Sequence, residues 1–206
     1  MEYDKLATSE SITKTTEALK TLSSADVTTV NTKEEALEKI KALIPEGASV
    51  MNGSSRTLEE IGFVEYLKSG IHGWNNLHDA VFTEKDSEKQ AELRKRSVLS
   101  DFYLGSAHAV AETGEMVFAS NSGSQLPHLV FTSPNIILVV STKKIVPTLL
   151  EAIARVENYV YPLEDKRAKD IGWGGSQISK LLLWKKENAK MGRKIHIIFV
   201  EEKLGF

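Results

Sequence analysis

The residues of this 206-residue chain that could bind or transform a ligand are concentrated in four polar loops. The first loop joins a short apolar segment to a predicted helix. A glycine there lets a ligand approach the backbone, and the free N–H groups at the start of a helix attract anions. We therefore expect this loop to bind a small anion through Asn52, Gly53, Ser54, Ser55 and Thr57. The alternative is that Ser54 or Ser55 only caps the helix.

The second loop, Gly105 to Gly114, follows another predicted strand and contains Ser106 and the Glu112-Thr113-Gly114 turn. A carboxylate at such a position could act as a nucleophile or a general base, which makes Glu112 the candidate catalytic residue. Ser106, Thr113 and Gly114 are candidates for ligand binding. The alternative for Glu112 is a turn residue that faces water. His108 in the same loop is more typical of a structural histidine.

The third and fourth loops offer polar groups and an aromatic ring. The third, Ser120 to His128, contributes Asn121, Gly123 and Gln125, whose amide groups suit a polar ligand, although the segment could also be an ordinary connection. The fourth, Gly172 to Ser176, surrounds Trp173 with glycines. It could form a lid, a stacking platform or a plug at the edge of the core. The five histidines are scattered without the spacing of a metal site, so no metal site is expected.

Composition excludes several classes of protein. The net charge of −2 gives no basic face for nucleic acid. The absence of cysteine rules out disulfides and thiolate-bound zinc or iron–sulfur clusters, and it fits a reducing cytoplasm, the location we expect. No apolar stretch approaches the roughly 20 residues of a membrane helix, so no membrane partner is expected. The polar N-terminus does not have the pattern of a signal peptide.

Strand and helix patterns alternate along the chain. We expect strands over residues 27–30, 48–51, 101–105, 116–119, 136–140 and 195–200. We expect helices over residues 4–22, 57–68, 83–99, 144–159 and 176–190, and another that begins after Thr32 and ends before Pro45. This order predicts an α/β fold with a mostly parallel sheet flanked by helices, in which ligands bind at the carboxyl ends of the strands. Residues 1–206 are expected to form a single domain, with helix 4–22 as a candidate peripheral appendage.

Taken together, the motifs resemble the LUD-domain family, the LutC-like proteins of lactate utilisation. The resemblance runs from about Lys33 to Phe206. It is carried by four segments in the family's order, which are Gly53-Ser54-Ser55 with the run Thr57 to Gly62, Asp101 to Ser106 with Ala109 and Glu112-Thr113-Gly114, Ile145-Val146, and Leu204-Gly205-Phe206.

The resemblance implies a fold similar to the superfamily of phosphosugar isomerases, CoA transferases and formyltetrahydrofolate cyclo-ligases (NagB/RpiA/CoA transferase-like). It implies a component of L-lactate utilisation, the oxidation of L-lactate to pyruvate, that acts with separate iron–sulfur partner proteins. The strand-end loops add the expectation of a small anionic ligand. The chain itself has no cysteine to hold such a cluster. Two alternatives stay open. One is a stand-alone CoA-transferase-like or cyclo-ligase-like enzyme with Glu112 as nucleophile, and the other is a non-catalytic scaffold for redox partners. The sequence does not identify a cofactor or the oligomeric state, and an oligomer is compatible with it.

Overall fold

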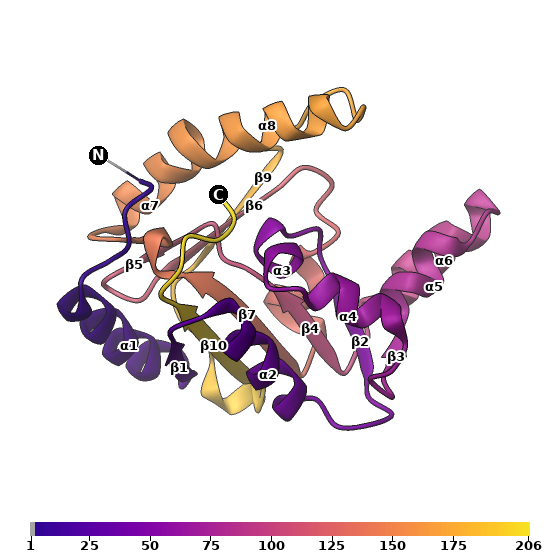
Figure 1. The fold of residues 1–206 in the computed structure, drawn as a ribbon, viewed down its shortest axis with the longest axis horizontal. Coiled ribbons are helices and arrows are strands. Elements are labelled where there is room, and N and C mark those ends of the chain that lie inside the picture. The colour runs from indigo at the N-terminus through magenta and orange to yellow at the C-terminus, as the bar shows by residue number, and fades with distance from the viewer. Residues whose placement is uncertain (1–2) are drawn as a thin grey trace.

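A six-stranded sheet lies at the centre of the molecule in the computed structural model, which describes residues 3–206 (Figure 1). The strands run in the order β1-β10-β7-β4-β2-β3, and every neighbouring pair is parallel. Their bounds are Asp26–Val30 (β1), Ser49–Asn52 (β2), Asn75–Asn76 (β3), Phe102–Gly105 (β4), Asn135–Ser141 (β7) and Lys194–Val200 (β10). The predicted α/β class with a mostly parallel sheet is therefore confirmed.

A second sheet of four strands, in the order β8-β5-β6-β9, packs beside the first. Its strands are Ala109–Ala111 (β5), Met116–Ser120 (β6), Ile145–Val146 (β8) and Lys180–Trp184 (β9). The helix expected over residues 176–190 is wrong, because β9 pairs antiparallel with β6 from Lys180 to Trp184. A short apolar run fits both a helix and a strand, and here the partner strand decides between them.

Eight α-helices surround the sheets within the described residues. They are Ser9–Ser23 (α1), Lys33–Leu43 (α2), Arg56–Glu60 (α3), Phe63–Ser69 (α4), Leu77–Thr83 (α5), Ser87–Ser97 (α6), Leu149–Arg155 (α7) and Tyr161–Asp170 (α8). Short π- and 3-10 turns lie at His128–Thr132 (η1), Thr142–Lys144 (η2), Val156–Val160 (η3) and Ala189–Met191 (η4). In Figure 1, α5 and α6 extend away from the body of the molecule. No helix in residues 3–206 is long and apolar enough to cross a membrane.

Four of the expected helices differ from the structure, each for a local reason. The helix expected over residues 57–68 is interrupted by Gly62, which takes a left-handed φ of 80° between α3 and α4. The helix expected over residues 83–99 is split, because Asp86 caps a new helix at Ser87. The helix expected over residues 144–159 begins only at Leu149, because β8 first pairs with β5. The first helix begins at Ser9, where Thr8 caps it.

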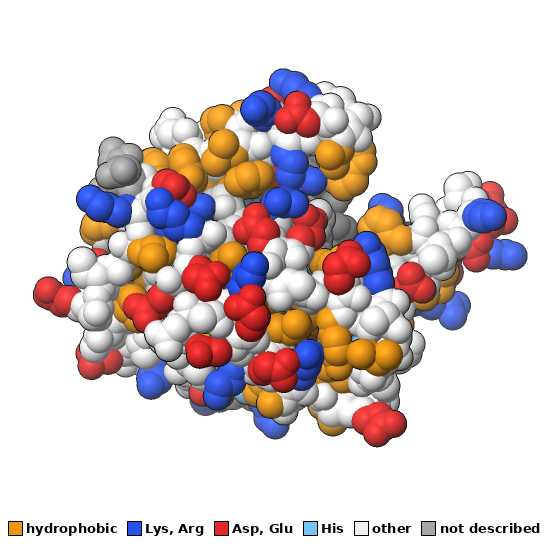
Figure 2. Space-filling view, in the orientation of Figure 1, with side chains coloured by type: hydrophobic (Ala, Val, Ile, Leu, Met, Phe, Trp, Pro, Cys, Tyr) orange, Lys and Arg blue, Asp and Glu red, His pale blue; other side chains and the backbone are white. Residues whose placement is uncertain are grey.

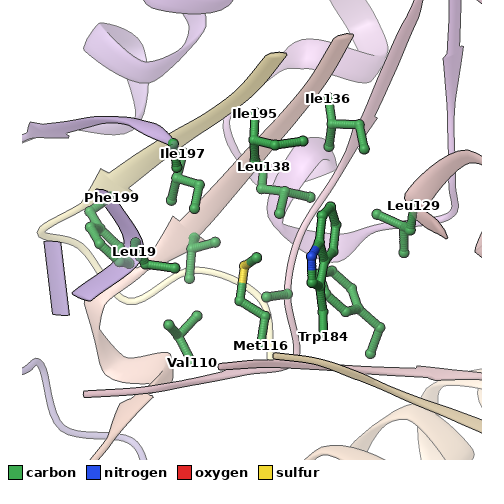
Figure 3. Packing of buried hydrophobic residues seen from close by; sticks show 14 of the residues in the cluster. Leu19, Val110, Met116, Leu129, Ile136, Leu138, Trp184, Ile195, Ile197 and Phe199 are labelled. Atoms are coloured by element: carbon green, nitrogen blue, oxygen red, sulfur yellow. The ribbon is translucent and has the colours of Figure 1, made fainter. Parts of the chain in front are cut away.

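Apolar residues cover both faces of the large sheet. Alternate residues of β7 belong to different clusters, with Ile136 and Leu138 on one side and Ile137 and Val139 on the other. The first cluster fills the space between the two sheets, where Figure 3 shows Met116 and Trp184 pointing toward β7 and β10. The second lies under α2 and α3. This packing holds the loops after β2 and β4 against the small sheet. On the face seen in Figure 2, acidic and basic side chains are interspersed, which fits the near-neutral net charge.

Candidate functional site

A cavity of about 330 Å³ opens at the carboxyl ends of β2 and β4. This is the size range of ordinary small-molecule sites. The loops that follow the two strands, residues 53–57 and 105–108, form one side. The other sides come from the end of β6 and its following loop, Lys144 in η2, the segment from η3 through α8, the loop over residues 173–178, and Gly205 with Phe206. Ligand sites in parallel sheets commonly lie at this edge.

The structure brings together most of the residues that the sequence predicts for ligand binding. The cavity is lined by Gly53, Ser54, Ser55, Thr57, Ser106, Asn121 and Gln125. Asn52 lies directly behind this lining, where its amide nitrogen donates a hydrogen bond to the Gly53 carbonyl over 3.2 Å. Gly123 lies between the lining residues Ser122 and Ser124, against the side chain of Lys180. The three loops after β2, β4 and β6 therefore meet at one site.

Glu112, Thr113 and Gly114 lie apart from the residues that line the cavity. The Glu112 carboxylate accepts a hydrogen bond from the Ser11 hydroxyl over 2.7 Å and pairs with Lys14 Nζ at 2.9 Å, both on α1. These two partners lower the pKa of Glu112, so the side chain is ionised and bound. Gly114 packs against Ala18 of the same helix, and Thr113 donates to Glu115. This turn fastens α1 to the small sheet.

Glycine at position 53 is required by the close approach of a buried tyrosine. A Cβ atom on Gly53 would lie 2.6 Å from the Tyr103 hydroxyl. That hydroxyl donates to the Gln125 side-chain oxygen over 3.5 Å, and Gln125 Nε2 donates to the Ala119 carbonyl over 2.8 Å. Burial raises the pKa of Tyr103 far above its usual value, so the phenol stays protonated. The predicted glycine thus sets the position of one wall of the cavity.

Lys144 is one of several lining residues that the sequence did not predict. Its side-chain nitrogen donates to the Thr57 hydroxyl over 2.9 Å and to the Ser106 hydroxyl over 3.1 Å. Lys144 is only 4% exposed, and within residues 3–206 no carboxylate forms an ion pair with it. Burial is the main cause that lowers its pKa well below 10.5, and the nearby Arg155 and Lys143 lower it further, while Glu60 acts against them. Two predicted hydroxyl residues therefore hold one buried amine.

The signal for Lys144 in the sequence is its position after a wholly apolar strand. The residues Thr142-Lys143-Lys144 follow β7, and the carboxyl end of that strand faces the same edge as β2 and β4. Lysines are rarely buried, and the sequence predicted only the start of a helix at Lys144, so residue type alone does not mark this side chain as part of a site. Its hydrogen-bond partners Thr57 and Ser106 are distant in the sequence, so no local pattern reports that this side chain is buried.

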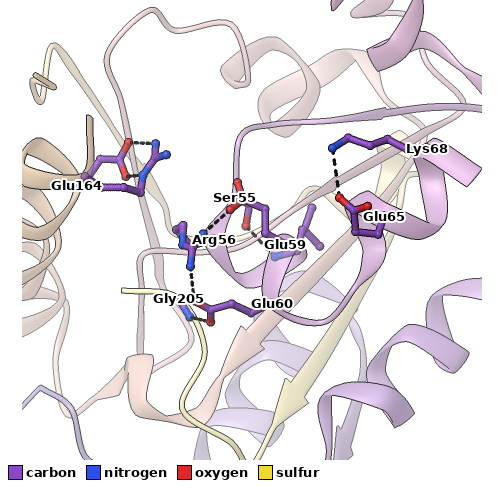
Figure 4. A network of polar contacts seen from close by, with 10 residues as sticks. Ser55, Arg56, Glu59, Glu60, Glu65, Lys68, Glu164 and Gly205 are labelled. Carbon is purple, nitrogen blue, oxygen red and sulfur yellow. Dashed lines mark hydrogen bonds and ion pairs between the residues drawn. The ribbon is translucent and has the colours of Figure 1, made fainter. Parts of the chain in front are cut away.

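The C-terminal segment covers Lys144 through a glycine. Gly205 has a left-handed φ of 63°, and a Cβ atom there would lie 3.0 Å from Lys144 Nζ. Its N–H donates to the Glu60 carboxylate over 2.7 Å, and Glu60 also pairs with Arg56 at 3.2 Å. Figure 4 shows Glu60 between Arg56 and Gly205, with Glu59 as a second partner of Arg56. Glu60, the one acid in the described part of the chain that raises the pKa of Lys144, is thus already bound to two other groups.

His108 supplies a neutral imidazole to the cavity. Its Nδ1 accepts a hydrogen bond from the Ala119 N–H over 3.2 Å, which places the proton of the neutral ring on Nε2. Burial lowers the pKa of His108 to about 3, with smaller contributions from the nearby Lys144 and Arg155. The ring is uncharged at neutral pH and adds no positive charge beside Lys144.

The wall formed by α8 and its following loop carries an exposed aromatic ring. The Glu164 carboxylate accepts two hydrogen bonds from the Arg167 guanidinium, over 2.7 and 2.6 Å. That guanidinium lies 5.4 Å from the centre of the Trp173 ring, and Trp173 is 65% exposed. Trp173 therefore lies at the edge of the cavity and does not plug the core. Among the described residues, no group of three or more metal-binding side chains is present.

Comparison with known proteins identifies the family. The LUD domain matches residues 12–200, and the chain therefore belongs to the LUD-domain family, which is associated with lactate utilisation. The fold is similar to the crystal structure of a DUF162 family protein from Deinococcus radiodurans, with a TM-score of 0.56 and 16% sequence identity over 95% of this chain and 99% of that one. At this identity the likeness concerns the fold alone. No curated protein matches the sequence.

Proposed function

We propose that this protein binds a small carboxylate in the strand-end cavity and acts as a component of L-lactate utilisation together with separate redox proteins. The observation that carries the proposal is Lys144, a buried lysine that lines the cavity and whose partners are two hydroxyl groups. A buried cation without an acidic partner is costly, and proteins normally avoid it. A bound carboxylate would supply the missing negative charge.

The surroundings of Lys144 suit an anion. Ser54, Ser55 and Ser106 line the same cavity and offer hydroxyl donors. The two nearby cations, Arg155 and Lys143, disfavour a positive charge on Lys144 in the empty site, and an anion would offset this repulsion. Ligand binding would therefore favour the protonated lysine, and the charged pair would be strong because the site is sheltered from water.

The redox step belongs to partner proteins in this proposal. Conversion of lactate to pyruvate releases two electrons and two protons per molecule, so it requires an electron acceptor. The chain has no cysteine and cannot hold an iron–sulfur cluster through thiolates. The association of the LUD-domain family with lactate utilisation supports this division of roles.

The transferase alternative with Glu112 as nucleophile has no support from the geometry of the cavity. Glu112 is not among the lining residues, and its carboxylate is engaged by Ser11 and Lys14. A nucleophile must reach the reacting atom of the bound substrate. The scaffold alternative does not account for a buried lysine in a cavity lined with hydroxyl groups.

Isothermal titration calorimetry with L-lactate and with its neutral amide tests the proposal. We expect L-lactate to bind, and lactamide to bind at least about tenfold more weakly because it lacks the charge, a difference of about 1.4 kcal/mol. Lys144→Met should remove this preference, while the matched variant of the exposed Lys68, Lys68→Met, should keep it. Equal binding of lactate and lactamide, or unchanged binding by Lys144→Met, would contradict the proposal.

A further inference from the structure

We propose that the side-chain nitrogen of Lys144 is a nucleophile that forms an imine with the keto group of a 2-oxo acid bound in the cavity. This inference rests on the proposed function, because it names the substrate class and the reaction of the same site. It assigns Lys144 a covalent role in addition to the role of a positive charge. The argument uses the hydrogen bonds of the nitrogen, the charges around it and the chemistry of 2-oxo acids.

The hydrogen bonds of Lys144 match an uncharged amine. An ammonium group has three N–H donors, whereas a neutral amine has two donors and one lone pair. Within residues 3–206 the nitrogen donates two hydrogen bonds, to the Thr57 hydroxyl at 2.9 Å and the Ser106 hydroxyl at 3.1 Å. Both hydroxyl residues also line the cavity. The lone pair of a neutral amine held in this way is left without a partner and is available to a ligand.

The charges around Lys144 favour the uncharged amine in the empty site. Burial lowers the pKa of Lys144, and Arg155 of α7 and Lys143 of η2 lower it further. Glu60 of α3 acts in the opposite direction but is held by Arg56 and the Gly205 N–H. His108 in the same cavity is neutral. Lysines that lose their proton through burial and neighbouring cations are the ones that form imines with carbonyl compounds.

The reaction needs no further reactant. The lysine nitrogen attacks the keto carbon, a C–N bond forms, and the carbonyl electron pair moves to the oxygen, which takes up a proton while the nitrogen loses one. The resulting hydroxyl group leaves with a second proton as water, and the nitrogen lone pair forms the C=N bond. The net change is amine plus ketone to imine plus water, without oxidation or reduction. The hydroxyls of Thr57 and Ser106, already hydrogen-bonded to the nitrogen, are placed to pass these protons.

A 2-oxo acid fits this site better than a simple ketone or aldehyde. Its carboxylate lies on the carbon next to the keto group, and therefore next to the nitrogen of the imine. When the imine is protonated, this carboxylate supplies the counter-charge that Lys144 does not find in the described part of the protein. The compound thus brings both the reactive carbonyl and the missing negative charge to a buried position.

Chemical trapping tests the imine directly. The intact protein is incubated with pyruvate, treated with sodium cyanoborohydride, digested and analysed by peptide mass spectrometry. We expect a reduced pyruvate adduct on Lys144, while the adjacent Lys143, which pairs with Asp4 at 3.0 Å, stays unmodified. Protein incubated with pyruvate but without sodium cyanoborohydride is the blank. An absence of adduct on Lys144, or equal modification of Lys144 and exposed lysines, would overturn the inference.

Calorimetry separates failure of the imine from failure of the proposed function. Lys144→Arg keeps a positive charge but cannot form an imine, so we expect it to lose trapping and to keep binding of L-lactate. Wild-type protein that binds pyruvate and lactate without trapping would overturn the imine and leave the carboxylate site intact. Wild-type protein that binds neither acid would overturn both. Because trapping in the wild type is the primary measurement, the outcome does not depend on the folding of a variant.

Discussion

Lys143 and Lys144 are neighbours in the chain, and both are buried, yet their surroundings are opposite. Lys143 is 6% exposed and pairs with the Asp4 carboxylate at 3.0 Å, which also binds Lys203. Lys144 is 4% exposed, and within residues 3–206 its side-chain nitrogen donates hydrogen bonds to two hydroxyl groups and to no carboxylate. The first lysine is satisfied inside the fold. The second lysine has no acidic partner among residues 3–206, which is why we propose that a ligand supplies the negative charge.

The same contrast holds for the regions around the two lysines. On the side of α1 and the segment before it, the acidic residues Asp4 and Glu112 are each paired with lysine. On the cavity side, the buried amine of Lys144 forms no ion pair within residues 3–206. The pairs of Asp4 and Glu112 fasten the N-terminal helix. The cavity lining has ion pairs too, such as Glu164 with Arg167, and differs in holding one buried amine without an acid among the described residues.

The largest effect on stability is expected where the chain covers Lys144. Gly205→Ala adds a Cβ atom directly against the Thr57 hydroxyl and 3.0 Å from Lys144 Nζ, at a left-handed backbone position. The strain and the overpacking should together lower the free energy of unfolding by about 2–4 kcal/mol. Gly47→Ala is the matched control, since Gly47 is also left-handed but has nothing within 4 Å of a new Cβ atom. It should cost only about 1–2 kcal/mol. Urea denaturation measures both, and equal losses would show that Lys144 is not tightly covered.

Exchange of the two lysines for methionine should separate binding from stability. Lys144→Met is expected to weaken L-lactate binding by about 1.5–3 kcal/mol, the value of a hydrogen bond to a charged group, with little loss of stability in the empty protein. Lys143→Met should leave binding unchanged and lower the free energy of unfolding by no more than about 1 kcal/mol, because Asp4 is half exposed and keeps Lys203. Calorimetry and urea denaturation on the same samples measure the two effects. Loss of binding in both variants would remove the distinction between the lysines.

The free energy of unfolding should depend on pH because the pKa of Lys144 differs between the folded and the unfolded protein. The pKa of Lys144 in the folded protein lies well below 10.5, the ordinary value for a lysine. Burial is the main cause, and the nearby Arg155 and Lys143 lower the pKa further, whereas Glu60 raises it. Between these two pKa values the unfolded chain holds a proton that the folded protein lacks, so folding becomes more favourable as the pH rises. The wild type should gain stability relative to Lys144→Met by up to about 1.4 kcal/mol per pH unit. The gain should end above the unfolded pKa.

Urea denaturation from neutral to about pH 9 measures this difference. Lys68→Met, at an exposed position, gives the background of an ordinary lysine. A flat difference between the wild type and Lys144→Met would mean that the buried amine keeps its proton. That result would also weaken the argument for imine formation.

Sequence patterns predicted the strands of the large sheet except β3, because their signals are local. The run of apolar residues over 136–140 and that over 195–200 are typical of strands covered on both faces, and the loops after β2 and β4 follow from their positions. In the small sheet only β6 was predicted, as the strand over residues 116–119. β5 and β8 are three and two residues long, too short for a period, and β9 exists through its pairing with β6.

In the site, too, the residues placed by local sequence order were predicted, and those placed by distant contacts were not. Gly53, Ser55 and Thr57 were predicted because a strand, a turn and a helix follow one another in the sequence. Lys144 lies against Thr57, Ser106 and Gly205, which are far away in the chain. The pairing of Glu112 with α1 depends on how that helix packs, which no local pattern reports.

The smallest effect on stability is expected at Glu112, whose pair with Lys14 lies on the side of α1 and not in the cavity. Glu112→Gln removes the charge that pairs with Lys14, which is itself largely exposed, so the free energy of unfolding should fall by at most about 1 kcal/mol. The pKa of Glu112 is lowered in the folded protein, so this contribution is present above the unfolded pKa and is lost as the pH falls below it. Binding of L-lactate should not change, because Glu112 lies apart from the residues that line the cavity.

Glu164→Gln is the contrasting variant, because it alters a lining residue and its hydrogen bonds with Arg167, and it should change binding. Loss of binding in Glu112→Gln alone would place the candidate nucleophile in the site and favour the transferase alternative, whereas unchanged binding leaves the carboxylate with the role of fastening α1.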